Sequence, residues 1–396
     1  MIFKATLGNA NHPNYGVASI PFPIPKNQYE NCMEMLNLLE IGNPRQKDCK
    51  VIAIEGAFPV LKRTESLRVN LDELNYLAKR LDSFDVGEAA QFQAAAHKLE
   101  LFELKDLINL TFCCQQTTVI TNFSDLEAVG RDHYMNLHGG CACTEELENL
   151  DGQETALLLI QDSEGTITPY GVLYENGMKL RQLYDGNHFP CYHYEPDMLA
   201  VGLTSRQEPE DTPHVTWLYL PSNRKELERA MSRSGITDPE DMRFHFGESQ
   251  FPNEVDCALD FRYESIFELN ALAEAVQKLS QQDYIKLGAV VALAEPESAY
   301  QVRQLAENLD QFDFAPAVST PEEYGKYMIQ QSGHFSYDPH LEDFYDFAKY
   351  GHQRMEQEYG KFTDRGYVSY HGTLSLEELM MEEPSEQMDF RMDTMG

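Results

Sequence analysis

Residues 71–81 of the chain read LDELNYLAKRL, and residues 266–276, which lie 195 positions further on, read IFELNALAEAV. Apolar residues recur in both stretches at the spacing of one helix face, as at Leu71, Leu74, Ala78 and Leu81. The spacing predicts an amphipathic helix in each stretch. The shared Glu-Leu-Asn and Leu-Ala positions indicate an internal repeat.

The same shift pairs further positions along the chain, beginning with Ile41 and Ile236. Four pairs of glycines follow it, namely Gly130 with Gly325, Gly165 with Gly360, Gly171 with Gly366, and Gly177 with Gly372. One register that holds from Ile41 to Gly177 without net insertion is hard to reach by chance. We therefore interpret the chain as a tandem duplication.

The duplication predicts four parts of the chain: a first module at residues 1–185, a linker at 186–212, a second module at 213–380, and an acidic tail at 381–396. The linker is marked by residues 208–213, which read EPEDTP and contain two prolines. The tail begins MEEPSE, and we expect it to be disordered.

Each module has the same coarse plan. Strand-like segments open it, at residues 17–24 and 51–54 in the first module and 215–220 in the second. A helical middle follows, roughly at 71–110 and 266–309. A turn-rich segment and a short strand close it, at 171–174 and 366–370. Because the strands and helices are segregated rather than alternating, we predict an α+β fold of several domains, with small α/β subdomains around a helical middle.

The chain is strongly acidic, with 65 Asp and Glu residues against 31 Lys and Arg residues and a formal net charge of -34. Since 42% of the residues are hydrophobic, the chain can bury a core, and the charge belongs to a folded surface. Direct binding of nucleic acid is not expected, because such binding relies on Lys and Arg. The excess favours basic protein partners and equals the phosphate charge of roughly 17 base pairs of DNA. The alternative is that the acidity only keeps the protein dispersed.

The charge is unevenly distributed, because the first 80 residues hold ten bases and eight acids. Further along, acids recur at steps of three or four residues, a spacing that places them on one face of a helix. We predict a partner-binding acidic surface made of three such rows and two neighbouring acids. The first row is Glu100, Glu103 and Asp106; the second is Glu307, Asp310 and Asp313, with Glu322 and Glu323 nearby; the third is Glu342, Asp343 and Asp346.

Motifs for catalysis and metal binding are weak. The sequence has no phosphate-binding glycine loop, nucleophile elbow or HExxH helix, so we do not expect an enzyme. Residues 138–143 and 188–193 bring His and Cys together without a paired CxxC arrangement, and we expect no metal and no cofactor. We find no signal peptide and no run of about 18 apolar residues for a membrane helix. A cytoplasmic location with reduced thiols is the simplest expectation.

Parts of the sequence resemble the ArdA antirestriction proteins carried by bacterial mobile elements. The resemblance covers most of residues 213–375 and, more faintly, 15–180. It is carried in the second module by the helix start LNALA at 269–273, the segment LAENLDQFDF at 305–314, the acidic helix start EEYGKYM at 322–328, and the closing segments FAKYG at 347–351 and GYV at 366–368. The first module departs from this pattern at residues 111–118 and 157–160.

The resemblance implies an elongated protein whose surface carboxylates stand in for DNA phosphates and occupy the DNA groove of type I restriction-modification enzymes. It also implies either a homodimer or, for a covalent tandem, an intrachain pseudo-dimer. Three alternatives stay open: an inhibitor of another DNA-binding defence system such as a CRISPR effector, a non-catalytic scaffold of a mobile element, and an enzyme with a hidden carboxylate pair.

Overall fold

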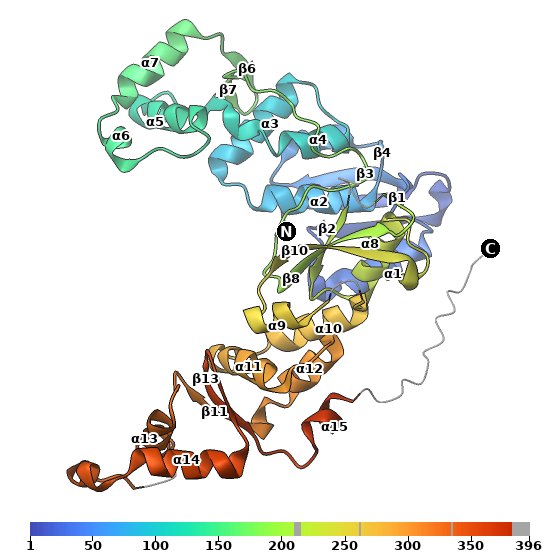
Figure 1. Ribbon diagram of the computed structural model, residues 1–396. Coiled ribbons are helices and arrows are strands. Elements are labelled where there is room, and N and C mark those ends of the chain that lie inside the picture. The colour runs from blue at the N-terminus through green and yellow to red at the C-terminus, as the bar shows by residue number, and fades with distance from the viewer. Residues whose placement is uncertain (210–214, 261–262, 334–335, 382–396) are drawn as a thin grey trace. The chain divides into compact units, whose positions relative to one another are not determined.

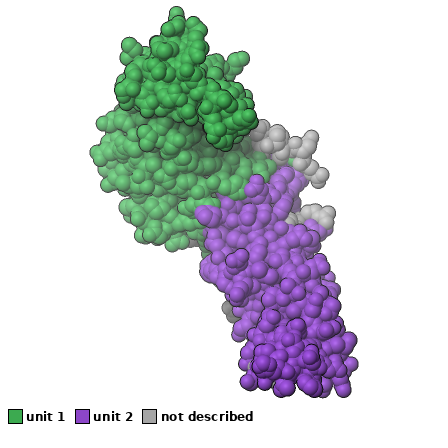
Figure 2. All heavy atoms as spheres, turned by 90° about the vertical axis from the view of Figure 1, so that its left-hand side faces the viewer, with its two compact units in different colours: residues 1–195, 209–217, 223–237 green, residues 196–208, 218–222, 238–396 purple. Residues whose placement is uncertain are grey.

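The computed structural model describes residues 1–209, 215–260, 263–333 and 336–381. The chain forms two compact units, which Figure 2 distinguishes by colour. Unit 1 comprises Met1–Glu195, Pro209–Trp217 and Asn223–Thr237, and unit 2 comprises Pro196–Glu208, Leu218–Ser222 and Asp238–Gly396. The chain therefore leaves unit 1 and re-enters it twice, at residues 209 and 223, before it continues into unit 2.

Unit 1 begins with an antiparallel sheet in the order β2-β1-β3-β4. Its strands are β1 (Phe3–Asn9), β2 (Val17–Phe22), β3 (Cys49–Gly56) and β4 (Arg68–Val69). Phe3, Leu7, Ile20 and Val51 are buried on one face of this sheet. This alternation fits the period of two that a half-buried strand requires. Helix α1 (Tyr29–Leu38) lies between β2 and β3 in the chain.

The helical middle of unit 1 consists of α2 (Leu71–Asp82), α3 (Val86–Lys98) and α4 (Leu104–Leu110) (Figure 1). Asn70 caps α2 by accepting hydrogen bonds from the backbone N–H groups of Asp72 and Glu73. The stripe quoted above is buried in the core of the unit, since Leu71, Leu74 and Leu81 are each 1% exposed. The helix predicted over residues 71–81 is therefore present, and its apolar face holds it against the sheet.

The rest of unit 1 is a small α+β portion, followed by one helix from later in the chain. A three-stranded sheet has the order β5-β7-β6, with β5 (Thr118–Ile120), β6 (Thr166–Thr168) and β7 (Gly171–Tyr174). Between β5 and β6 come α5 (Leu126–Leu137), α6 (Thr144–Glu148) and α7 (Gly152–Asp162). Helix α8 (Arg224–Arg233) completes the unit.

Unit 2 opens with a sheet in the order β10-β8-β9, made of β8 (Leu199–Ser205), β9 (Thr216–Leu220) and β10 (Met242–Ser249). The last three residues of β9 are the part assigned to unit 2. Helices α9 (Asn253–Ala258), α10 (Ile266–Gln277), α11 (Gln281–Ala294) and α12 (Ala299–Glu307) follow. The unit closes with a second small sheet in the order β11-β13-β12, two helices within its chain segment, and α15 (Leu376–Met380).

The elements of this closing portion are β11 (Phe312–Pro316), α13 (Pro321–Gln330), α14 (Phe347–Glu358), β12 (Lys361–Thr363) and β13 (Gly366–Tyr370). Their order repeats that of residues 118–174. Helices α2, α3, α4, α5 and α7 begin at residues 71, 86, 104, 126 and 152, and α10, α11, α12, α13 and α14 each begin 195 residues later. The segregated helices and small antiparallel sheets form an α+β fold, as predicted.

Local geometry recurs at the same spacing. The Oγ1 of Thr168 donates to the carbonyl oxygen of Gly171 at 2.8 Å, and Thr363 makes the same bond to Gly366 at 2.8 Å. Both glycines have positive φ, at 130° and 144°. A Cβ on either would collide with a carbonyl oxygen of the neighbouring strand, Ile120 or Ala315. The pairing of Gly171 with Gly366 in the sequence therefore has one structural cause, a turn that requires glycine at both positions.

The structure corrects the predicted linker. Residues 186–209 contain the fully buried strand β8 and a segment that packs on α2. In that segment the Tyr76 hydroxyl donates to the carbonyl oxygen of Pro190 at 2.9 Å, and Lys26 pairs with Glu195 at 2.8 Å. Residues 210–214 and the tail from residue 382 lie outside the described residues. None of the described helices has the length and apolar content needed to cross a membrane.

Candidate protein-binding surface

Helices α5 and α7 of unit 1 pack against each other at two glycines. A Cβ at Gly130 would collide with the carbonyl oxygen of Gly152, and one at Gly152 would collide with that of Glu127. Each helix begins at an aspartate cap: Asp125 accepts from the N–H of Ala128 at 3.0 Å, and Asp151 accepts from that of Glu154 at 2.9 Å. Helix α5 buries Gly130, and α7 buries Gly152, Ala156 and Leu159, so most residues of both helices remain at least partly exposed.

The α5–α7 segment, residues 125–164, is the most acidic stretch of unit 1. It holds ten Asp and Glu residues and a single basic residue, Arg131, which pairs with Glu127 at 2.9 Å. All ten carboxylate residues are exposed. They are Asp125, Glu127, Asp132, Glu145, Glu146, Glu148, Asp151, Glu154, Asp162 and Glu164. Asp132 is exposed at its surface, but partial loss of solvent around its carboxyl group, and then the charges of Asp85 and Asp125, raise its pKa above the ordinary value.

Helices α13 and α14 of unit 2 repeat this arrangement. A Cβ at Gly325 would collide with the carbonyl oxygen of Phe347, and one at Gly351 would collide with that of Pro321. The α13–α14 segment, residues 322–358, holds eight Asp and Glu residues and three Lys and Arg residues. Its surface is therefore acidic as well, although bases neutralise part of it.

The first predicted row of acids does not lie on one helix. Helix α3 ends at Lys98 and α4 begins at Leu104, so Glu100 and Glu103 lie outside both helices. Glu100 has a φ of 53°, which breaks the helical path. Glu103 is exposed and pairs with Lys47 at 3.3 Å, and only Asp106 lies in the first turn of α4. The predicted shared helix face is wrong here.

The second predicted row is also not helical. Glu307 is the last residue of α12 and pairs with Arg303 at 3.4 Å, Asp310 lies in a short 3-10 turn, and Asp313 lies in β11. All three acids are exposed. Asp310 and Asp313 both act electrostatically on Lys286, whose pKa is nevertheless lowered, chiefly by burial. The structure thus brings these two acids near one lysine rather than onto one helix face.

Glu322 and Glu323 are exposed in the first turn of α13, as the acidic helix start suggested. Glu323 closes a capping box with Thr320, and hydrogen bonds from Ser319 and Thr320 lower the pKa of its carboxyl group. Its carboxylate therefore has a structural role in addition to any role at the surface.

The third predicted row spans two elements. Glu342 and Asp343 lie in a 3-10 turn at Pro339–Phe344, and Asp346 caps α14 by accepting from the N–H of Lys349 at 3.0 Å. Glu342 pairs with Lys326 at 3.2 Å, and this contact is the main cause that lowers the pKa of its carboxyl group. Asp343 is exposed and is the member of the row least engaged in local structure among the described contacts.

The acidic rows predicted from the sequence did not include the most acidic stretch of unit 1, residues 125–164. The expected rows fell elsewhere because helix spacing was used to select acids, whereas the acids of residues 125–164 are spread over three short helices and their loops. A local count of acids against bases would have found this segment, since ten acids accompany one base.

Unit 1 has a cavity of ≈ 870 Å³ beside α3 and α5, with Asp85, Glu88, Gln91 and Asp132 among its lining residues. It lacks a nucleophile paired with a base. Among the residues that the structure describes, no three His, Cys, Asp or Glu residues come together as metal ligands. In the segment predicted to bring His and Cys together, the Sγ of Cys191 lies 3.6 Å from Nε2 of His193. Cys113 and Cys114 are buried, and burial raises the pKa of both thiols.

Residues 210–369 match the family model described as antirestriction protein (ArdA). None of the curated proteins compared with the chain matches it. The match spans β9 to β13 and so includes the α13–α14 segment, together with helix α8. It also coincides with the region that carries the sequence resemblance. Residues 210–369 of the chain are therefore similar to the ArdA antirestriction family, and residues 1–209 lie outside this match.

Proposed function

We propose that the protein inhibits type I restriction-modification enzymes by presenting exposed carboxylates in place of the phosphates of DNA. The observation that carries this proposal is the α5–α7 segment, where all ten acids are exposed and only one base accompanies them. Restriction enzymes hold DNA in basic grooves, and such grooves attract a dense, fixed array of negative charge.

The placement of the charge supports this function better than it supports simple solubility. A charge that only disperses the protein has no reason to spare one part of it, yet the first 80 residues are close to neutral. The excess lies further along, in segments that include two helix pairs with the same glycine-dependent crossing. Because the crossing fixes the two helices of each pair against each other, their backbones need not be ordered when a partner binds.

We also infer that the chain consists of two tandem ArdA-like modules, of which residues 1–185 form the divergent one. The recurrence of five helix starts at one spacing supports this inference, as do the equivalent glycines of the two helix pairs. Under this interpretation the first module takes part in the mimicry, because its α5–α7 segment is the more acidic of the two. The partner is the protein complex and not its DNA, since a net charge of -34 repels nucleic acid.

A cleavage assay tests the proposal. A purified type I enzyme is given unmodified DNA, and cleavage is measured while the protein is titrated against the enzyme. The proposal predicts inhibition at a near-stoichiometric ratio. The triple variant Glu148→Gln, Asp162→Asn and Glu164→Gln should raise the half-inhibitory concentration by about threefold to a hundredfold, as expected for exposed charge pairs of about 0.2–1 kcal/mol each.

A matched control removes the same three charges from the near-neutral region, as Glu30→Gln, Glu34→Gln and Glu55→Gln, and should leave inhibition unchanged. Equal losses in both triple variants would point to net charge alone. If the wild-type protein does not inhibit the type I enzyme, that enzyme is not its target. If the protein instead inhibits another DNA-binding defence enzyme in the same kind of assay, that enzyme becomes the proposed target.

A further inference from the structure

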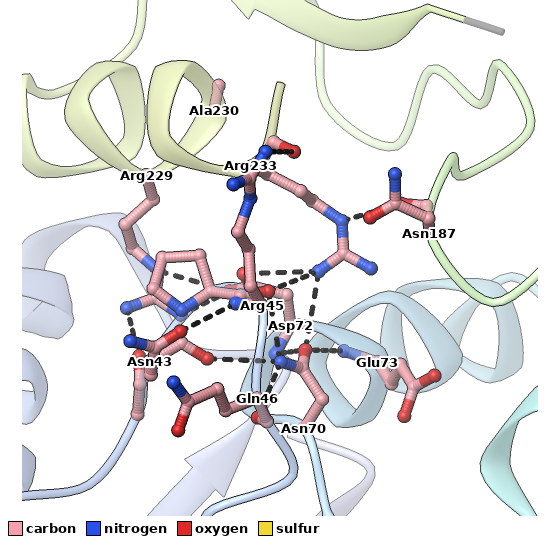
Figure 3. A network of polar contacts seen from close by, with 12 residues as sticks. Asn43, Arg45, Gln46, Asn70, Asp72, Glu73, Asn187, Arg229, Ala230 and Arg233 are labelled. Atoms are coloured by element: carbon pink, nitrogen blue, oxygen red, sulfur yellow. Dashed lines mark hydrogen bonds and ion pairs between the residues drawn. The ribbon is translucent and has the colours of Figure 1, made fainter. Parts of the chain in front are cut away.

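Helix α8 lies within the residues that match the ArdA family, yet it is part of unit 1. Residues 218–222, directly before it, and the chain from residue 238 onward belong to unit 2. The first helix of the family-matched region is therefore packed among residues 1–195. What holds it there is a set of buried polar contacts within unit 1 (Figure 3).

Arg229 is the first of two arginines that α8 directs into this contact. Its Nε and Nη2 atoms donate to Oδ1 of Asp72 at 3.1 and 2.7 Å, and its Nη1 donates to the carbonyl oxygen of Gly42 at 2.6 Å. The side chains of Arg229 and Asp72 are 15% and 18% exposed. This charged pair is largely, though not fully, shielded from water, and it is held by fixed hydrogen bonds and not by long-range attraction alone.

Arg233 follows one helical turn later and is 5% exposed. Its Nε donates to the carbonyl oxygen of Asn187 at 2.7 Å, and its Nη1 donates to that of Pro44 at 3.0 Å. Its Nη2 donates to the hydroxyl group of Tyr184 at 2.9 Å. The guanidinium carbon also lies 4.1 Å from the centre of the Phe189 ring.

The groups that receive the two arginines come from three separate parts of the chain, and they are themselves held in place. Asn70 donates from Nδ2 to the carbonyl oxygens of Asn43, Pro44 and Gln46 at 3.0–3.1 Å, which fixes the loop before β3. The ring of Phe189 stacks on those of Tyr184 and of Tyr76 in α2, with 4.9 Å and 4.5 Å between the ring centres. We call residues 42–46, Asn70, Asp72 and residues 184–189 the α8 receptor.

The complementary side chains occur once in the chain, although the helices recur. At the spacing of 195 residues, α1 carries Glu34 and Leu38 in place of Arg229 and Arg233. On the receptor side, the equivalents of Asn70 and Asp72 are Ser265 and Phe267. Helix α1 therefore cannot make these bonds to either set of positions. The contact is therefore specific for α8, because α1 lacks the two arginines that the receptor binds.

We propose that the α8 receptor is a docking site for one partner, helix α8 of the same chain, and that Arg229 and Arg233 determine the specificity of this docking. The N-terminal region thereby anchors the first helix of the family-matched domain. The docking concerns contacts within unit 1 only, so it can be tested on the protein alone, whatever enzyme the protein inhibits.

Hydrogen–deuterium exchange of the full chain tests the docking. The variants are Arg229→Asp, Asp72→Arg, and the double variant that carries both changes and so reverses the pair. Each single variant should raise amide exchange in residues 224–233 by at least about tenfold, because it leaves like charges buried together and lowers the free energy of local opening. The double variant should bring exchange back toward the wild-type rate. Exchange in β1 and β3 should stay unchanged in all three.

The control is Arg224→Asp, which changes a 60%-exposed side chain of the same helix and should not alter exchange beyond the first turn. Arg229→Lys keeps the charge but loses the two-pronged geometry, and it provides a milder variant if a charge reversal prevents folding. It should raise α8 exchange less than Arg229→Asp does. The proposal would be overturned if α8 exchanged at the wild-type rate in both Arg229 variants. It would also be overturned if the amides of α8 exchanged as fast in the double variant as in the two single variants.

Discussion

Arg233 donates a hydrogen bond of 2.9 Å to the hydroxyl group of Tyr184, which in turn donates to Oε1 of Glu73 at 3.0 Å. Tyr184 and Glu73 are 0% and 2% exposed. One buried chain of hydrogen bonds therefore joins α8, α2 and the segment after β7. A buried polar group that loses its hydrogen-bond partner destabilises the fold, so we expect each bond of this network to contribute to the free energy of unfolding.

Replacing Tyr184 with Phe tests how much the Tyr184 hydroxyl group contributes to stability. The change removes one hydroxyl that both accepts from Arg233 and donates to Glu73, while it keeps the ring stacked on Phe189. We expect the unfolding free energy to fall by about 1–3 kcal/mol, the cost of leaving buried polar groups unpaired. Urea denaturation measures it, with Tyr359→Phe, at an 88%-exposed position, as the control. Equal stability of Tyr184→Phe and wild type would show that the two partners are satisfied without the hydroxyl.

Glu73 should make unit 1 less stable as the pH rises. Burial is the main cause that raises the pKa of Glu73 above its ordinary 4.5. A carboxyl group whose pKa is raised by folding holds its proton more tightly in the folded than in the unfolded protein. Its contribution to stability is thus fully present below pH 4.5 and is lost as the pH rises through the folded pKa.

Glu73→Gln removes this pH dependence. The difference in unfolding free energy, variant minus wild type, should become more positive between about pH 4 and about pH 8. Urea denaturation at several pH values measures the difference, and Glu34→Gln on the exposed side of α1 should show no such trend. A difference for Glu73→Gln that is flat with pH, or that becomes more negative, would contradict the assignment.

The pair Glu254–Arg365 in unit 2 should have the opposite pH dependence. Arg365 donates from Nε and Nη2 to the two carboxylate oxygens of Glu254, each at 2.7 Å, and this contact is the main cause that lowers the pKa of Glu254. A lowered pKa contributes stability above the unfolded value of 4.5, and that stability is lost as the pH falls through the folded pKa. Glu254→Gln should therefore destabilise at neutral pH and approach wild-type stability in acid. Thermal unfolding of the variant and the wild type at pH values above and below 4.5 measures this difference in stability. A variant that loses the same stability at every pH would contradict the ionic character of the pair.

The glycines at the two helix crossings should not tolerate a side chain. Gly130→Ala and Gly325→Ala should each lower stability by about 1–3 kcal/mol or more, because the added methyl group meets backbone and not a flexible side chain. Gly87→Ala, at an exposed position in the first turn of α3, is the control and should be neutral or mildly stabilising. Circular dichroism during thermal unfolding measures all three. Wild-type stability of Gly130→Ala would show that α5 and α7 cross less closely.

Local patterns in the sequence predicted much of the fold. The apolar stripes gave α2 and α10, because every stripe residue packs into a core, and the closing strands β7 and β13 followed from short apolar runs after glycine. Strand β8 was missed because its neighbours at residues 208–213 carry two prolines, which outweighed its seven buried residues. The acid rows assumed that a helix continues through residue 100, where Glu100 in fact adopts a left-handed backbone.

The α8 receptor lay beyond sequence reasoning for a different reason. Arg229 and Asp72 are 157 positions apart, and neither the helix period nor the repeat spacing relates them. Only the packing of three chain segments brings the two charges together. The same limit applies to the acids of residues 125–164, since all ten are exposed but are spread over α5, α6, α7 and their loops and not along one helix face.

DNA mimicry is tested by a competition experiment in which a labelled DNA duplex is bound to a type I restriction-modification enzyme. The wild-type protein is then added at about 50 mM and at about 200 mM salt, and the released DNA is measured. We expect displacement of the DNA near one protein per DNA-binding site, with a potency that falls as the salt concentration rises, because the attraction is between charges. DNA that stays bound at both salt concentrations while the protein remains folded would contradict DNA mimicry as the mechanism of this protein.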